Sequence, residues 1–216
     1  MSQSTEIPTP VLLKAMTHSA LKLSLFVFVC IVLLLGVRYV TAPYIAQAEK
    51  ETLLNTFNQV LPDALYNNDP LSDTLEITDP EQLAALGAES PVTVYRARLD
   101  DQPAGIIFSA IAPNGYSGNI YMLIGVLPDG RISGVRVLKH KETPGLGDKI
   151  ELYKNPWILE FNGRSLREDN EARWAVKKDG GDFDQFTGAT ITPRAVVGAV
   201  KRALQLINQT GDTLYE

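Results

Sequence analysis

The sequence predicts an α+β domain with an antiparallel sheet, attached to a single N-terminal transmembrane helix. Three patterns indicate this arrangement. Residues 23–37 form a run of fifteen residues without a charge. Short segments in the middle of the chain alternate apolar and polar residues, which is typical of strands. Residues 193–208 carry an apolar stripe at helical spacing, so helices flank a central group of strands.

The uncharged run is long enough to cross a bilayer once its flanks are added. Residues 21–42 span the roughly 30 Å hydrocarbon core if Lys22 and Arg38 extend to the two interfaces. A buried core helix would have a polar face, which this segment lacks. A cleavable signal peptide is the other alternative, because residues 46–48 (Ala-Gln-Ala) resemble a cleavage site. That site lies well beyond the run and after Arg38, so we expect an uncleaved anchor.

The charges around the span predict its orientation. Lys14, Lys22 and the amino terminus precede it, and Arg38 follows it. The positive-inside rule then places residues 1–20 in the cytoplasm and the rest outside, in the periplasm of a cell with two membranes. We expect residues 43–90 to form a helical linker and the start of the exported domain, and residues 91–216 to form the main domain at the inner (cytoplasmic) membrane.

Composition excludes several classes of protein. With 216 residues, 45% of them hydrophobic and 21% charged, the chain is neither disordered nor fully embedded in a membrane. From residue 43 onward acidic residues outnumber basic ones, 24 to 17, which argues against a nucleic-acid partner. Cys30 has no partner for a disulfide, and with His18 and His140 it cannot build an ordinary Cys/His metal site.

The exported part has recognisable local signals. We expect an amphipathic helix from residue 45 to Pro62, and strands at residues 92–99 and 105–108. The clearest hairpin joins residues 119–126 and 131–138 through the turn at 128–130, and residues 173–177 predict a later strand. In the last helix, Thr192 suits the N-cap, Pro193 the first helical position, and Gly211 the position after the end.

One candidate site precedes the last helix, at residues 184–193 (Asp-Gln-Phe-Thr-Gly-Ala-Thr-Ile-Thr-Pro). Gly188 frees the backbone and Ala189 leaves room, while Thr187, Thr190 and Thr192 offer hydroxyls. The N–H groups and the positive dipole end at a helix N-terminus favour an anion such as a phosphate. By itself the same pattern also fits an ordinary threonine-capped helix.

A second candidate site follows the hairpin, at residues 140–149 (His-Lys-Glu-Thr-Pro-Gly-Leu-Gly-Asp-Lys). Pro144, Gly145 and Gly147 force an irregular path that brings backbone amides close to whatever lies against the loop. Such a loop can line a flat ligand, or it can be a turn only. No nucleophile or paired carboxylate accompanies His140 in the sequence, so we expect a surface or hydrogen-bonded residue there and no catalytic one.

The string at residues 184–190 resembles the acceptor motif of proteins that carry FMN attached through its phosphate to a threonine. The pattern has an Asp, two variable residues, Ser or Thr, Gly, Ala and the acceptor, which here is Thr190. Residues 142–147 and 115–118 (Gly-Tyr-Ser-Gly) resemble two further signatures of the same FMN-binding domain. By its length and motif order, the chain is similar to the family of G subunits of the Rnf (Rsx) ion-translocating electron-transport complex.

The resemblance implies an electron carrier without catalytic residues of its own, in a complex that moves electrons between ferredoxin and NAD and couples this to ion transport. Residues 91–216 would form the covalent FMN-binding domain. A flavin transferase would attach the FMN from FAD, and the other membrane subunits of the complex would be the partners. The resemblance implies these cofactor-binding residues: Asp184, Thr187, Gly188, Ala189, Thr190, Thr192, Glu142, Thr143, Gly145, Leu146 and Gly147.

Three alternatives remain open at this point. The C subunit of the sodium-pumping NADH:quinone reductase shares the domain, but it is usually longer and has Ser where this chain has Thr187. A membrane-anchored assembly subunit would carry no flavin. A membrane-tethered flavin reductase would need a second pocket with acid–base residues, for which the sequence offers no obvious pair.

Overall fold

The computed structural model describes residues 9–215, so the first eight residues of the predicted cytoplasmic segment lie outside the described residues. By its internal contacts the chain divides into two compact units, with the boundary between Leu53 and Leu54.

The first unit is formed by helix α1 (Thr9–Val60), whose last turns belong to the second unit. From Met16 onward this helix is long and apolar enough to cross a membrane, by length and composition, and its large apolar side chains between Met16 and Ile45 are exposed. The separate helix expected from residue 45 is instead a continuation of α1. Pro43 lies inside the helix, where it removes one backbone hydrogen bond without ending the helix.

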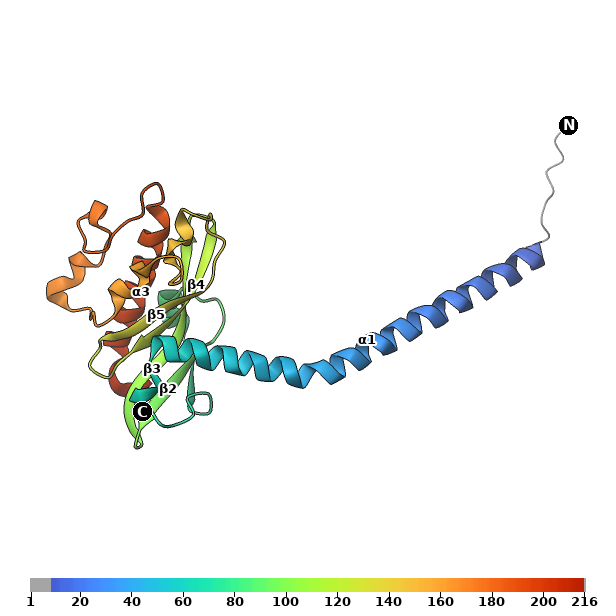
Figure 1. Cartoon of the computed structure of the whole chain (residues 1–216), viewed down its shortest axis with the longest axis horizontal. Coiled ribbons are helices and arrows are strands. Elements are labelled where there is room, and N and C mark those ends of the chain that lie inside the picture. The colour runs from blue at the N-terminus through green and yellow to red at the C-terminus, as the bar shows by residue number, and fades with distance from the viewer. Residues whose placement is uncertain (1–8, 216) are drawn as a thin grey trace. The chain divides into compact units, whose positions relative to one another are not determined.

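The second unit is built on a sheet of five antiparallel strands in the order β1-β2-β3-β4-β5, which confirms the predicted fold class (Figure 1). The strands are β1 (Thr74–Ile77), β2 (Val92–Leu99), β3 (Gln102–Gly115), β4 (Gly118–Val126) and β5 (Ile132–Lys139). The short helix α2 (Pro80–Leu86) connects β1 to β2. Each strand pairs with the next along the chain, so β3 to β5 form two successive hairpins, and the second is the one the sequence predicts.

Helix α3 (Ile191–Thr210) packs on one face of this sheet, chiefly against β3. Its apolar stripe is fully buried, as its spacing predicts: Val196, Val197, Val200, Leu204 and Ile207. They face the alternate inward residues of the strands, among them Phe108, Ala110, Met122 and Ile124. Gly211, with φ of 65°, ends the helix at the expected position.

The opposite face of the sheet is sealed by the last residues of α1 and by Leu61. Phe57, Val60 and Leu61 have no exposed surface, and the Phe57 ring lies 4.7 Å from the Tyr95 ring, centroid to centroid. Two glycines permit the close approach. A Cβ added to Gly125 or Gly134 would lie 2.7 Å from an atom of Val60. The helix therefore ends as part of the domain core.

Between β5 and α3 the chain forms short 3₁₀ turns around an aromatic cluster: η2 (Gly147–Ile150), η3 (Pro156–Phe161), η4 (Glu168–Arg173) and η5 (Lys177–Asp179). The cluster comprises Trp157, Phe161, Trp174, Phe183 and Phe186. The predicted strand at residues 173–177 is wrong, since only a single bridge joins Val176 to Phe183. The alternation there has another cause, because Trp174 and Val176 are both buried in the core.

Candidate functional site

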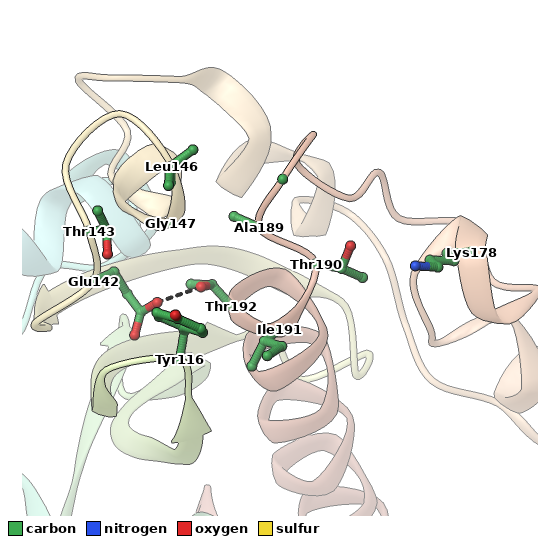
Figure 2. Close-up of a pocket in the computed structure, with 11 residues that line it drawn as sticks. Tyr116, Glu142, Thr143, Leu146, Gly147, Lys178, Ala189, Thr190, Ile191 and Thr192 are labelled. Carbon is green, nitrogen blue, oxygen red and sulfur yellow. Dashed lines mark hydrogen bonds between the residues drawn. The ribbon is translucent and has the colours of Figure 1, made fainter.

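A cavity of about 620 Å³ lies where the N-terminus of α3, the loop after β5 and the β3–β4 turn meet (Figure 2). Eight of the eleven residues that line it were predicted from the sequence: Glu142, Thr143, Leu146, Gly147, Gly188, Ala189, Thr190 and Thr192. The other three are Tyr116, Lys178 and Ile191. The two candidate loops, which are about forty residues apart in sequence, therefore share one cavity.

A buried carboxylate holds these segments together. Glu142 is only 5% exposed, and its Oε1 accepts a hydrogen bond from the backbone N–H of Ser117 at 3.0 Å. Its Oε2 accepts a hydrogen bond from the hydroxyl of Thr192 at 2.5 Å (Figure 2). A buried carboxylate needs such donors, and hydrogen bonds to a charged acceptor are the strong ones. Glu142 thus ties the β3–β4 turn and the first turn of α3 to the loop after β5.

The close approach of the loop to α3 requires a glycine at position 147. A Cβ there would lie 2.7 Å from Thr192 Oγ1 and 2.7 Å from Glu142 Oε2, so any side chain would press on the hydrogen bond between them. Gly188, on the other loop, has φ of 80° and faces Leu146, whose Cδ2 would lie 3.8 Å from an added Cβ. The two loops are therefore in direct contact.

A polar network supports the outer side of the 142–147 loop. Asp148 accepts the backbone N–H of Gly145 at 2.8 Å and the Lys154 ammonium at 2.6 Å. The hydrogen bond from Lys154 lowers the pKa of the Asp148 carboxyl. His140 accepts the backbone N–H of Glu142 on Nδ1 at 2.9 Å, and its Nε2 is bonded to the carboxylate of Glu151. Of the two expected roles, surface or hydrogen-bonded, His140 has the second, and its hydrogen bonds support the loop.

Three of the predicted residues lie outside the cavity lining. Gly145 has φ of 79° and directs its N–H to Asp148, and Thr187 is exposed. The Asp184 carboxylate forms an ion pair with Lys177 at 2.5 Å, and its side chain is 57% exposed. Its backbone carbonyl accepts the indole N–H of Trp157 at 2.8 Å, which anchors the segment to the aromatic cluster.

Helix α3 begins two residues earlier than the sequence predicts. The N-cap is Thr190, and its side chain makes no capping hydrogen bond. The expectation that Thr192 is the N-cap and Pro193 the first helical residue is wrong, since Thr192 is buried inside the first turn. Its hydroxyl is taken by Glu142, a partner that only the folded chain brings near. Thr190 is half-buried and lines the cavity, with its hydroxyl free of any capping role.

Sequence reasoning missed Lys178 altogether. It lies on η5, ahead of the acceptor motif, and no local pattern marks it as a site residue. Tyr116 lies within the 115–118 string that resembles a flavin signature, and Ile191 directly follows the acceptor-like string at 184–190. Both positions were therefore in view from the sequence, although neither was chosen as a site residue. Tyr116 is 67% exposed and Ile191 46% exposed, and both present apolar surface at the rim of the cavity.

Comparison with known proteins defines the class of this site. Residues 115–205 match the family model of the FMN-binding domain, and residues 1–60 match that of the RnfG N-terminal region. The first match includes every residue that lines the cavity, together with α3 up to Gln205. The chain thus combines a flavin-binding domain with an N-terminal region of a recognised kind.

Relatives are similar over nearly the whole chain. The G subunit of an ion-translocating oxidoreductase complex from Vibrio atlanticus (strain LGP32) is 45% identical over 203 residues, covering 94% of this chain and 95% of that one. The protein of the same description from Pseudomonas aeruginosa (strain UCBPP-PA14) is 46% identical over 201 residues, covering 93% and 92%. The chain belongs to the family of G subunits of ion-translocating oxidoreductase complexes.

Among solved structures, the crystal structure of Shewanella oneidensis NqrC is similar with a TM-score of 0.46 and 22% identity, covering 71% of this chain and 70% of that one. The family assignment rests on the full-length relatives and not on this likeness.

Proposed function

We propose that this chain is the flavin-carrying electron-transfer subunit of an ion-translocating oxidoreductase complex, with FMN attached through its phosphate to Thr190. One observation carries the proposal. The acceptor-like segment before α3 and the 142–147 loop line a single cavity of about 620 Å³, a volume usual for small-molecule and cofactor sites. The family model of the FMN-binding domain covers the same residues.

The residues present suit a flavin. Leu146 and Tyr116 offer apolar surface to a flat ring, Thr143 offers a hydroxyl, and Gly147 allows the loop backbone to approach closely. Thr190 lies at the start of a helix, where N–H groups and the dipole favour a phosphate by about 0.3–1 kcal/mol. Bound FMN would supply the ability to accept and donate electrons, and the protein would hold and orient it.

Attachment requires a separate flavin transferase that recognises the motif, Asp184 included. In the proposed step the Thr190 hydroxyl oxygen attacks the flavin-side phosphate of FAD. The Oγ–P bond forms as the bond between the two phosphates breaks, AMP leaves, and the hydroxyl proton passes to a base of the transferase. The half-buried but accessible position of Thr190 supports this role. Asp184 is paired with Lys177, but its side chain remains 57% exposed, so the transferase can reach its carboxylate.

The membrane arrangement is also part of the proposal. Residues 21–42 form the anchor, the N-terminus faces the cytoplasm, and the domain lies outside at the inner membrane, where the other subunits of the complex are its partners. The charges flanking the span and the continuous apolar helix support this topology. A reporter enzyme that is active only in the periplasm should be active when fused after Glu216, and inactivity there would reverse the orientation.

The experiment on attachment compares Thr190→Ala with Thr187→Ala after co-expression with a flavin transferase. Denatured wild-type chain should show flavin fluorescence in a gel, and Thr187→Ala should retain it because that hydroxyl lies outside the cavity lining. Thr190→Ala should lose the fluorescence while its unfolding transition stays close to that of the wild type. Peptide mapping that places the flavin phosphate on Thr187 or Thr192 would refute the assignment.

A further inference from the structure

Lys178 is the one basic residue among those that line the described cavity, and Glu142 is the one acidic residue. The two lie at opposite ends of it. Figure 2 shows Lys178 beyond Thr190, with its ammonium nitrogen on the side facing that threonine, and Glu142 on the far side near Tyr116. The Glu142 carboxylate already accepts two hydrogen bonds from the protein. The positive end of the cavity is therefore the end where Thr190 lies.

Lys178 forms no ion pair in the part of the chain that the structure describes, although it has acidic neighbours in sequence. Each of those neighbours is paired with a different basic residue. The pairs are Asp179 with Arg194 at 2.6 Å, Asp182 with Arg173 at 2.9 Å and with Arg164 at 3.3 Å, and Asp184 with Lys177 at 2.5 Å. The ammonium of Lys178 is therefore available to a charged ligand.

The turn that carries Lys178 is fixed against the start of α3. Arg194, in the first turns of the helix, donates two hydrogen bonds to the Asp179 carboxylate, at 2.6 and 2.9 Å. The backbone N–H of Lys178 itself is held by the side chain of Gln185 at 3.2 Å. A paired Arg–carboxylate fork restrains geometry more than a single contact does. The backbone at Lys178 is thus fixed near the start of α3 by two independent contacts.

We propose that Lys178 is the counter-ion of the flavin phosphate at Thr190. The inference rests on the proposed function and adds to it the residue that recognises the charge of the ligand. A phosphodiester keeps one negative charge, and lysine is a common point-charge partner for phosphate. The α3 N-terminus contributes a partial charge only, so a full positive charge near Thr190 completes the electrostatic balance of the site.

The test measures binding of free flavins, so it does not depend on covalent attachment. In the full chain carrying Thr190→Ala, purified in detergent, the dissociation constants of FMN and of riboflavin are measured by quenching of flavin fluorescence. Riboflavin has the same ring but no phosphate. Adding Lys178→Met should weaken FMN binding by at least about tenfold, the lower end of the scale for one hydrogen bond to a charged group, and leave riboflavin unchanged. Lys178→Arg should retain most of the affinity for FMN.

Lys141→Met is the matched control, because it removes the same charge from an exposed side chain outside the cavity lining. It should leave both dissociation constants unchanged, whereas a general effect of net charge would weaken FMN in both variants. If Lys178→Met leaves FMN binding intact, or weakens riboflavin equally, the counter-ion role is wrong while the flavin site stands. If the Thr190→Ala chain binds neither flavin, this inference fails, whereas the proposed function fails only if the gel shows no flavin on the denatured wild-type chain.

Discussion

Replacing Gly147 by alanine tests the central contact of the site. The added Cβ would lie 2.7 Å from Glu142 Oε2 and 2.7 Å from Thr192 Oγ1, which are the two atoms of a buried 2.5 Å hydrogen bond. It would also lie 3.0 Å from Glu142 Cβ. Such distances are too short for a carbon atom, so the loop must move away from α3 and the hydrogen bond must lengthen or break.

The expected cost follows from these contacts. Loss of a hydrogen bond to a charged group costs about 1.5–3 kcal/mol, and overpacking of a tight site costs about 1–3 kcal/mol. Movement of the loop relieves the overpacking but breaks the hydrogen bond, so the two costs do not add in full. We therefore expect the free energy of unfolding to fall by about 2–4 kcal/mol. For a unit of this size, each kcal/mol lowers Tm by about 2–4 °C, so the loss in Tm should be about 5–15 °C.

The assay is urea or thermal unfolding followed by tryptophan fluorescence, since Trp157 and Trp174 both lie in the aromatic cluster of the domain. A double-mutant cycle with Thr192→Ala isolates the contact. Thr192→Ala removes the hydroxyl that the new Cβ would strike, so Gly147→Ala should cost at least about 1 kcal/mol less in that background than in the wild type. Additive costs would refute the reasoning.

Three further predictions concern stability. Gly198→Ala, inside α3 and with its nearest contact at 3.6 Å, should stabilise the domain by about 0.5–1 kcal/mol in urea titrations, since alanine is the better helix former. Phe57→Ala should cost about 3–5 kcal/mol and allow the end of α1 to detach from the sheet, visible as faster amide exchange in β4. The hydrogen bond from Arg194 lowers the pKa of Asp179, and that from Arg173 lowers the pKa of Asp182. The two ion pairs therefore stabilise the domain fully above the unfolded-state pKa of about 4, and this stabilisation is lost as the pH falls through the lower folded-state pKa values. When the pH is lowered below about 4, the urea concentration at the unfolding midpoint should decrease, and it should decrease less in Asp179→Asn.

Local signals in the sequence determined much of the fold. The apolar run, the hairpin with its turn at 128–130 and the apolar stripe of α3 are each encoded by neighbours in the chain, and the structure confirms all three as helix or strand. The two loops of the site were also visible as candidates, although their glycines and threonines alone fit a turn and a threonine-capped helix equally well. The resemblance to flavin motifs is what selected their residues. Eight of the residues selected from those loops line one cavity.

Only the tertiary structure decided how these pieces meet. Glu142 and Thr192 are fifty residues apart, and their hydrogen bond depends on the register of the hairpins and on how α3 lies across them. That hydroxyl is bonded to Glu142 inside the first turn of α3, and the N-cap of the helix is Thr190 and not the expected Thr192. The alternation at residues 173–177 was mistaken for a strand because packing in an aromatic cluster buries the same positions as a sheet would. Lys178 lies at the site because the ion pair between Asp179 and Arg194 holds the η5 turn against α3. Contacts between distant segments have no local pattern, because they arise from the packing of elements that are each specified separately.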